Sequence, residues 1–78
     1  MDLDDERVSL AKAEDDITAG ERRVSALEMR VERLRRDGRG TKDAEDLLQT
    51  FQQTLSAWRG HREEILRHIA RLEAKARP

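Results

Sequence analysis

Apolar residues recur at a fixed spacing along the first half of the chain. The series is Leu3, Leu10, Ile17, Val24 and Val31, with a second series three positions later at Ala13, Gly20, Leu27 and Leu34. These are the a and d positions of a seven-residue repeat lettered a to g. They predict a helix over residues 3–37 with one narrow apolar stripe. Glu6 interrupts the d series, and Asp2 is placed to cap the start of the helix.

A second heptad pattern fills the other half of the chain. Its a positions are Thr41, Leu48, Leu55, Arg62, Ile69 and Ala76, and its d positions are Ala44, Phe51, Trp58, Ile65 and Leu72. Gly38 and Gly40 lie between the two patterns, and glycine takes the left-handed conformation that ends a helix. Thr41 is a residue type that caps the next helix. The sequence therefore predicts a turn over residues 38–41 and a helix over residues 42–76.

Two heptad helices joined by a short turn predict an all-α fold: an antiparallel two-helix coiled-coil hairpin, forming a single domain over residues 1–78. Charges beside the seam favour one register, in which the numbers of facing a and d residues sum to 75. It pairs the opposite charges Arg7 with Glu73, Glu21 with Arg59, Arg35 with Glu45, Asp16 with His61, and Asp2 with Lys75. A shift of one heptad brings Glu14 against Glu73 and makes the connection longer than helix links usually are.

A hairpin roughly 50 Å long with one seam buries little surface, so its stability on its own is marginal. Four apolar residues outside the strict seam predict a second contact surface, with Leu47 at g, Leu66 at e, and Val8 and Met29 at f. We therefore expect a homodimer that forms a four-helix bundle. Scattered surface aliphatics are also normal, so a monomeric hairpin and a complex with another helical protein remain alternatives.

Charged residues make up 42% of the chain and aromatic residues 3%, a composition shared by disordered chains and coiled coils. The heptads favour the coiled coil. The chain has no cysteine, hence no disulfide or thiolate metal site. No apolar run is long enough to span a bilayer, and the acidic start lacks the basic and apolar regions of a signal peptide. These features predict a cytoplasmic protein with no membrane partner.

The net charge of −1 conceals an uneven distribution: residues 1–20 sum to −5 and residues 21–40 to +3. Basic residues gather near the turn, where Arg30, Arg33, Arg36 and Arg39 are candidates for contact with a partner or a nucleic acid. Residues 28–46 hold six basic and six acidic side chains, however, and both aromatics fall at d, where we expect no base stacking. The arginines thus favour a role at the negative end of the helix dipole, with nucleic-acid binding as an alternative.

Other chemistry has little support in the sequence. His61, Glu64 and His68 are weak candidates for a metal site, because each neighbouring pair shares a helix face while the two histidines lie about 10 Å apart along the axis. We expect ordinary surface histidines and no cofactor. Arg62 occupies an a position, where Asp16 and Glu21 are near enough to pair with it. Without a cysteine, a tyrosine or a glycine-rich phosphate loop, the chain is not expected to be an enzyme.

The stretch Arg36-Asp37-Gly38-Arg39-Gly40-Thr41-Lys42-Asp43-Ala44-Glu45-Asp46-Leu47-Leu48-Gln49-Thr50-Phe51, with His61-Arg62-Glu63-Glu64-Ile65 after it, resembles short uncharacterised helical proteins of alphaproteobacteria. The resemblance covers about residues 20–70 and implies a bacterial, cytoplasmic origin without implying a function. The expected architecture also looks like that of the Rop protein, a dimeric helical hairpin that binds RNA, although no motif is shared. From the sequence we expect a protein that acts through protein–protein contacts, as an adaptor, chaperone-like or regulatory coiled coil.

Overall fold

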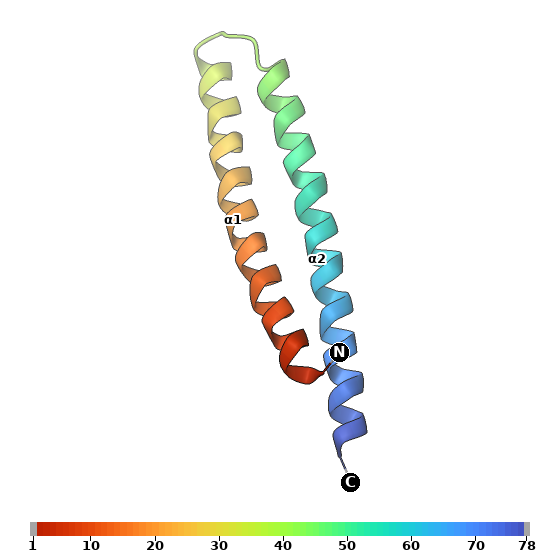
Figure 1. The fold of residues 1–78 in the computed structure, drawn as a ribbon. Helices are drawn as coiled ribbons and strands as arrows, with labels where there is room; N and C mark the ends of the chain where they lie inside the picture. The colour runs from red at the N-terminus through yellow and green to blue at the C-terminus, as the bar shows by residue number, and fades with distance from the viewer. Residues whose placement is uncertain (1, 78) are drawn as a thin grey trace.

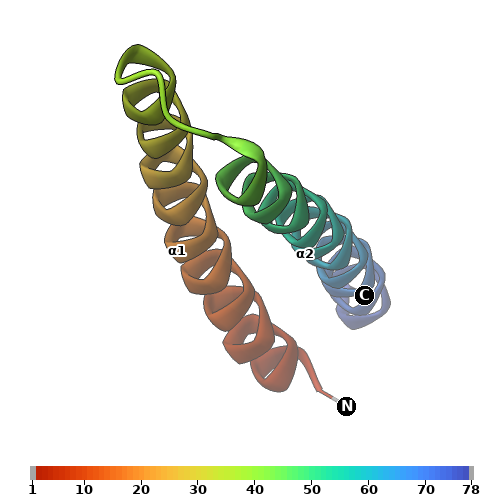
Figure 2. The same cartoon turned by 90° about the horizontal axis from the view of Figure 1, so that it is seen from above.

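The computed structural model describes residues 2–77, which form two α-helices, α1 over Leu3–Arg36 and α2 over Lys42–Ala76. The helices run antiparallel, joined by one turn at one end, and the last turns of α2 extend past the start of α1 (Figure 1). The protein is thus an all-α helical hairpin, as the heptads predict. Its extents are 65 × 15 × 14 Å. Seen from above, the two helices form one layer with two open sides (Figure 2).

The ends of α1 carry the two caps that its sequence predicts. Asp2 Oδ1 accepts a hydrogen bond of 2.9 Å from the backbone N–H of Asp5. At the other end Gly38 has a φ of 68°, in the left-handed region, and the backbone N–H of Arg39 donates to the carbonyl of Leu34 at 2.9 Å. The N–H of Gly38 donates to the carbonyl of Arg35 at 3.2 Å. These two bonds form a Schellman motif, which stops the helix and turns the chain back.

Thr41 precedes α2 at the expected position, but its side chain does not cap the helix backbone. The Thr41 hydroxyl donates instead to Glu45 Oε1, at 3.2 Å. The same carboxylate oxygen accepts a hydrogen bond of 2.8 Å from Arg35 Nη2. The prediction of a threonine cap was therefore wrong, because Glu45 is held over the turn by Arg35 and offers the hydroxyl a charged acceptor.

Two ion pairs between the helices confirm the predicted register. Arg35 pairs with Glu45 at 2.8 Å near the turn, and Arg59 Nη2 donates to Glu21 Oε2 at 3.1 Å near the middle. All four side chains are about half exposed or more, so the pairs select the register more than they stabilise it.

The other predicted pairs do not form among the described residues. Arg7 lies 3.9 Å from Asp4, one turn away on the same helix, and Asp16 pairs with Lys12 at 3.1 Å. A partner three or four residues away on the same helix is within reach without ordering two long side chains across the gap between the helices. The pairs within α1 therefore form in place of the predicted pairs between helices.

The core is a single apolar seam between the helices. Its buried hydrophobic residues are Ala13, Ile17, Leu27, Val31, Ala44, Leu55, Ile65 and Ile69. Trp58, at a d position, was expected to be covered, yet it is 36% exposed. A large indole in a seam only two helices wide has no third helix to cover its outer edge. The structure therefore corrects the expectation that this hairpin offers no exposed aromatic surface.

Candidate association surface

The two open sides of the hairpin differ in chemistry. One side, which we call the ion-paired side, carries the e positions and is bridged by the pairs Glu21–Arg59 and Arg35–Glu45. The other, which we call the aromatic side, carries the g positions, where α2 exposes Leu47 and Trp58 with the half-buried Phe51 between them, and Arg23 faces them from α1. Because d positions border g positions around a helix, the two aromatic residues at d emerge on this side only.

Trp58 lies on Gly20 of α1. A Cβ atom at position 20 would meet Cζ3 of Trp58 at 3.1 Å and Cδ1 of Leu55 at 3.3 Å, so the indole occupies the space that a side chain there would fill. The close approach explains a glycine in the interior of α1, where it otherwise costs about 1 kcal/mol relative to alanine. Asp16, Ala19 and Arg23 line the shallow groove beside this contact.

Phe51 lies one heptad nearer the turn and is half-buried. The guanidinium carbon of Arg23 lies 5.2 Å from the centre of its ring, within the range of a cation–π contact. Leu47, 47% exposed, continues the strip toward the turn. The aromatic side thus carries a strip of partly exposed large apolar side chains, spaced along α2 by seven and then four residues.

The structure separates the arginines near the turn into two groups. Arg30, Arg33 and Arg39 line grooves on the aromatic side, and none of them has an ion-pair partner within the described part of the chain. Arg36 is exposed and lines neither groove. Arg35 is committed to Glu45 on the other side.

Lys42 is the sixth basic residue between positions 28 and 46, and it too has an acidic partner. Its Nζ lies 2.8 Å from Asp46 Oδ2, and the hydrogen bond and charge of that carboxylate raise the pKa of Lys42 above its usual value. Of the acidic residues that balance the charge of this region by count, Glu45 pairs with Arg35 and Asp46 with Lys42, whereas Asp43 lines the same groove as Arg30 and Arg39 on the aromatic side. Within the described part of the chain, the arginines of the aromatic side form no ion pair there, although they share the groove with this carboxylate.

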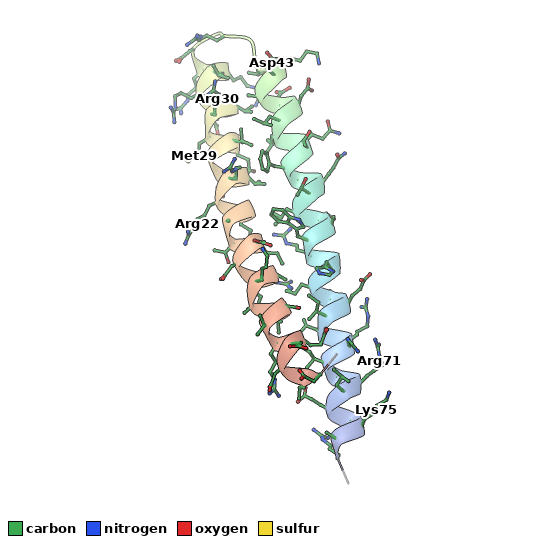
Figure 3. All side chains as sticks on the ribbon, viewed as in Figure 1. Arg22, Met29, Arg30, Asp43, Arg71 and Lys75 are labelled. Carbon is green, nitrogen blue, oxygen red and sulfur yellow. The ribbon has the colours of Figure 1, made fainter. Side chains whose placement is uncertain are left out.

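The four residues expected to make oligomer contacts do not gather on one face. Leu47 lies on the aromatic side, whereas Leu66 is at an e position and 39% exposed. Val8 and Met29 are 71% and 63% exposed at f positions, and Figure 3 shows Met29 on the edge of α1 remote from α2. The heptad pattern missed Phe51 and Trp58 as contact residues because both fall at d; for Trp58, the signal that could have found it was its size opposite Gly20.

Sequence reasoning also missed a contact between a buried carboxylate and a histidine at the open end of the hairpin. Glu6 is only 5% exposed, and its Oε2 lies 3.2 Å from Nδ1 of His68. His68 therefore contacts Glu6, and although it lines one groove with His61 and Glu64, no three potential ligands among residues 2–77 lie close enough to share a metal ion. The signal was present in the heptads, because a carboxylate at a d position needs a partner, and His68 is at a flanking g position of the facing helix.

Arg62 differs from its expected arrangement. Its Nε lies 3.8 Å from Glu63 Oε1, next to it in the chain, while the expected partners Asp16 and Glu21 pair with other residues. The Arg62 side chain is 33% exposed. It therefore runs along the seam and carries its charge outward, as long basic side chains do.

A scan against models of protein families, a search of curated proteins and a search of solved structures each found no match to this chain. Within residues 2–77, neither helix has a stretch both long and apolar enough to cross a membrane.

Proposed function

We propose that this chain is a non-enzymatic helical-hairpin protein that acts through protein–protein contacts and associates with itself as a homodimer, forming a four-helix bundle. The observation that carries the proposal is the strip of Leu47, Phe51 and Trp58 on one side of a hairpin whose other side is closed by ion pairs. Interfaces are enriched in aromatic residues and arginine, and Arg23, Arg30 and Arg33 of α1 lie beside this strip. Adaptor, chaperone-like or regulatory roles all fit such a surface.

The small core of the hairpin supports the same proposal. Two helices share one seam, and its least exposed members, Ile17, Leu55 and Ile65, still expose 3–5% of their surface. A second hairpin over the aromatic side would add a second layer to that seam, which is how four-helix bundles build a core. The proposal includes a bacterial, cytoplasmic setting, supported by the resemblance of residues 36–51 and 61–65 to helical proteins of alphaproteobacteria.

Sedimentation equilibrium over a range of micromolar concentrations tests the proposal. The chain has a mass of 9.1 kDa, so the expected result is a concentration-dependent rise toward twice that mass. Its single tryptophan is Trp58, which gives a second readout: its emission should shift to shorter wavelength as the concentration rises, because association removes the indole edge from water. A strict monomer at high micromolar concentration would exclude self-association.

Binding of RNA or DNA is a second candidate function. The observation that favours it is the row of Arg23, Arg30 and Arg33 along a groove that also contains Phe51. Arginine side chains can neutralise phosphates while an aromatic ring offers a face to a base. A gel shift with single-stranded and duplex RNA at two salt concentrations tests it, since phosphate contacts weaken steeply with salt. Absence of a shift, or a shift insensitive to salt, would remove this candidate.

A further inference from the structure

The half of the aromatic side nearest the turn has a lining that suits one class of partner. Its groove, which we call the basic groove, has a lining that includes Arg23, Leu27, Arg30, Arg33, Leu47 and Phe51. We infer that the basic groove is a docking site for an acidic amphipathic helix of another protein. The inference goes beyond the proposed self-association, because it names the chemistry of a second partner for the same side.

The floor of the basic groove is apolar. Leu47 is 47% exposed and the half-buried Phe51 follows four residues later on the same face of α2, with Leu27 of α1 between the helices. The α2 wall beside them is uncharged, since its g and c positions from 47 to 57 are leucine, two threonines and alanine. The hydroxyls of Thr50 and Thr54 donate to backbone carbonyls of their own helix, at 3.1 and 3.0 Å. An apolar side chain that enters the groove therefore meets no charge on this wall.

The α1 wall of the groove is basic. Arg23, Arg30 and Arg33 line it, and none of them has an ion-pair partner among residues 2–77. They lie at intervals of seven and three residues, about 10 and 5 Å along the axis, which is also the spacing of residues on one face of a helix laid alongside. Asp43 and Asp16 lie in the neighbouring grooves beyond its two ends, and Asp16 is already paired within α1. The wall thus offers positive charge to one flank of a bound helix, and a row of carboxylates complements it.

The apolar floor favours a helix over a nucleic acid. Leu27 and Leu47 offer no hydrogen bond and no stacking face, and their burial is favourable against other apolar groups. The Phe51 ring has the guanidinium carbon of Arg23 at 5.2 Å from its centre, so one of its faces is already covered, whereas base stacking needs an open face. An amphipathic helix in a groove uses both features, with its apolar face on the floor and its acids on the basic wall.

Neither helix of residues 2–77 meets this description itself. The acidic half of α1 turns its apolar residues Leu10, Ala13 and Ile17 toward α2, and the strip of α2 has no carboxylate at its g and c positions between 47 and 57. The geometry therefore assigns the occupant to another protein. Leu47 and Phe51 also belong to the strip proposed for self-association. On that proposed function rests one consequence, which is that the partner and a second copy compete for one surface.

A designed peptide of about 21 residues tests the inference, with leucine at the a and d positions of three heptads and glutamate at e and g. Glutamates on both flanks present carboxylates to α1 whichever way the peptide lies, and their mutual repulsion keeps the peptide from pairing with itself. The controls are a scrambled peptide of the same composition and a peptide with glutamine in place of glutamate. Fluorescence anisotropy should show a dissociation constant for the acidic peptide at least about tenfold lower than for either control.

Charge reversal in the chain supplies matched variants. Arg30→Glu/Arg33→Glu should weaken binding of the acidic peptide at least about tenfold. Arg22→Glu/Arg36→Glu makes the same change in net charge at exposed f positions and should leave binding within about twofold. Figure 3 shows Arg22 on the edge of α1 remote from α2. A peptide with lysine in place of glutamate should prefer Arg30→Glu/Arg33→Glu to the unmodified chain. Urea unfolding checks that both variants stay folded, as exposed substitutions allow.

The outcomes separate this inference from the proposed self-association. If the chain sediments as a dimer but binds the acidic peptide no better than the controls, or if both double variants weaken binding equally, the inference is overturned and self-association stands. If the chain sediments as a monomer and binds the peptide as expected, the inference stands without self-association. A single-stranded RNA that binds more tightly than the peptide, and that Arg30→Glu/Arg33→Glu no longer binds, would assign the basic groove to a nucleic acid and overturn the inference.

Competition is tested on a chain that does both. Saturating peptide should lower the sedimenting mass of the dimer toward that of a complex of one chain with one peptide. A dimer that persists with the peptide bound would contradict the shared surface, and Leu47→Ser then identifies which partner uses it. Loss of peptide binding alone would place self-association elsewhere and support the inference. Loss of the dimer alone would overturn it.

Discussion

The exposed edge of Trp58 follows from the residue that it faces. A tryptophan at a d position fits a two-helix seam only if the opposite helix offers space, and Gly20 provides that space at the cost of helix propensity. The indole still extends past the seam, which leaves 36% of the residue exposed. At this position one pair of residues determines both the packing of the hairpin and the chemistry of its aromatic side.

A comparison of two glycines tests this contact. Gly60→Ala places a methyl group where nothing lies within 4 Å, so it should stabilise the protein by about 1 kcal/mol through helix propensity alone. Gly20→Ala should be less stable than Gly60→Ala by about 1 kcal/mol or more, because the indole must move outward. Urea unfolding measures the difference, and Trp58 emission should shift to longer wavelength only in Gly20→Ala. Equal gains with unchanged emission would contradict the contact.

The contribution of the Glu6–His68 contact to stability can be measured by substituting each residue alone and both together. Glu6 is nearly buried and its carboxylate is 3.2 Å from His68 Nδ1, so His68→Ala should cost about 1–3 kcal/mol by leaving the carboxylate without its partner. In a Glu6→Leu background the same change should cost less than about 0.5 kcal/mol, because an aliphatic residue at d needs no partner. Thermal unfolding of the four proteins measures the coupling. Equal costs in both backgrounds would show that the pair contributes nothing.

At the level of elements, the helices and their register could be predicted because heptads and charges repeat along the chain. The pairs Glu21–Arg59 and Arg35–Glu45 are regular consequences of one alignment. The choice of Thr41 between backbone and carboxylate could not be predicted in the same way, since it depends on where a neighbouring side chain happens to reach. Arg7, which pairs within α1 instead of with Glu73, is a second example.

The two glycines of the turn, Gly38 and Gly40, also differ in a way that the sequence does not reveal. Gly38 has a φ of 68°, while Gly40 is not in the left-handed region. Gly38→Ala should therefore destabilise the hairpin by about 1–2 kcal/mol, because a Cβ is strained in that conformation. Gly40→Ala is the matched control and should change stability by less than about 0.5 kcal/mol, since its Cβ would meet nothing within 4 Å. Equal losses in chemical denaturation would show that both glycines limit the turn.

At the level of the whole molecule, the two open sides emerge only when both helices are in place. The sequence predicts that a second surface exists, yet its four candidate residues scatter over three faces, because each was identified only by lying outside the seam. The structure adds that Phe51 and Trp58 emerge on the side where Leu47 also lies. It also adds that the ion pairs occupy the opposite side. The difference between the aromatic side and the ion-paired side arises from the packing of α1 on α2, so it cannot be read from the heptad pattern of either helix alone.

Leu47 and Leu66 provide a matched test of that asymmetry, because the two leucines are 47% and 39% exposed on opposite sides of α2. If the aromatic side receives a second copy, Leu47→Ser should weaken association roughly tenfold, since each dimer loses two partly buried leucines. Leu66→Ser should leave the dissociation constant within about twofold, as should Val8→Ser on the outer face, because neither contact lies in the interface. Sedimentation equilibrium measures all three. A larger effect at Leu66 than at Leu47 would move the interface to the ion-paired side, where the charges of Glu21 and Arg59 would then have to be buried together.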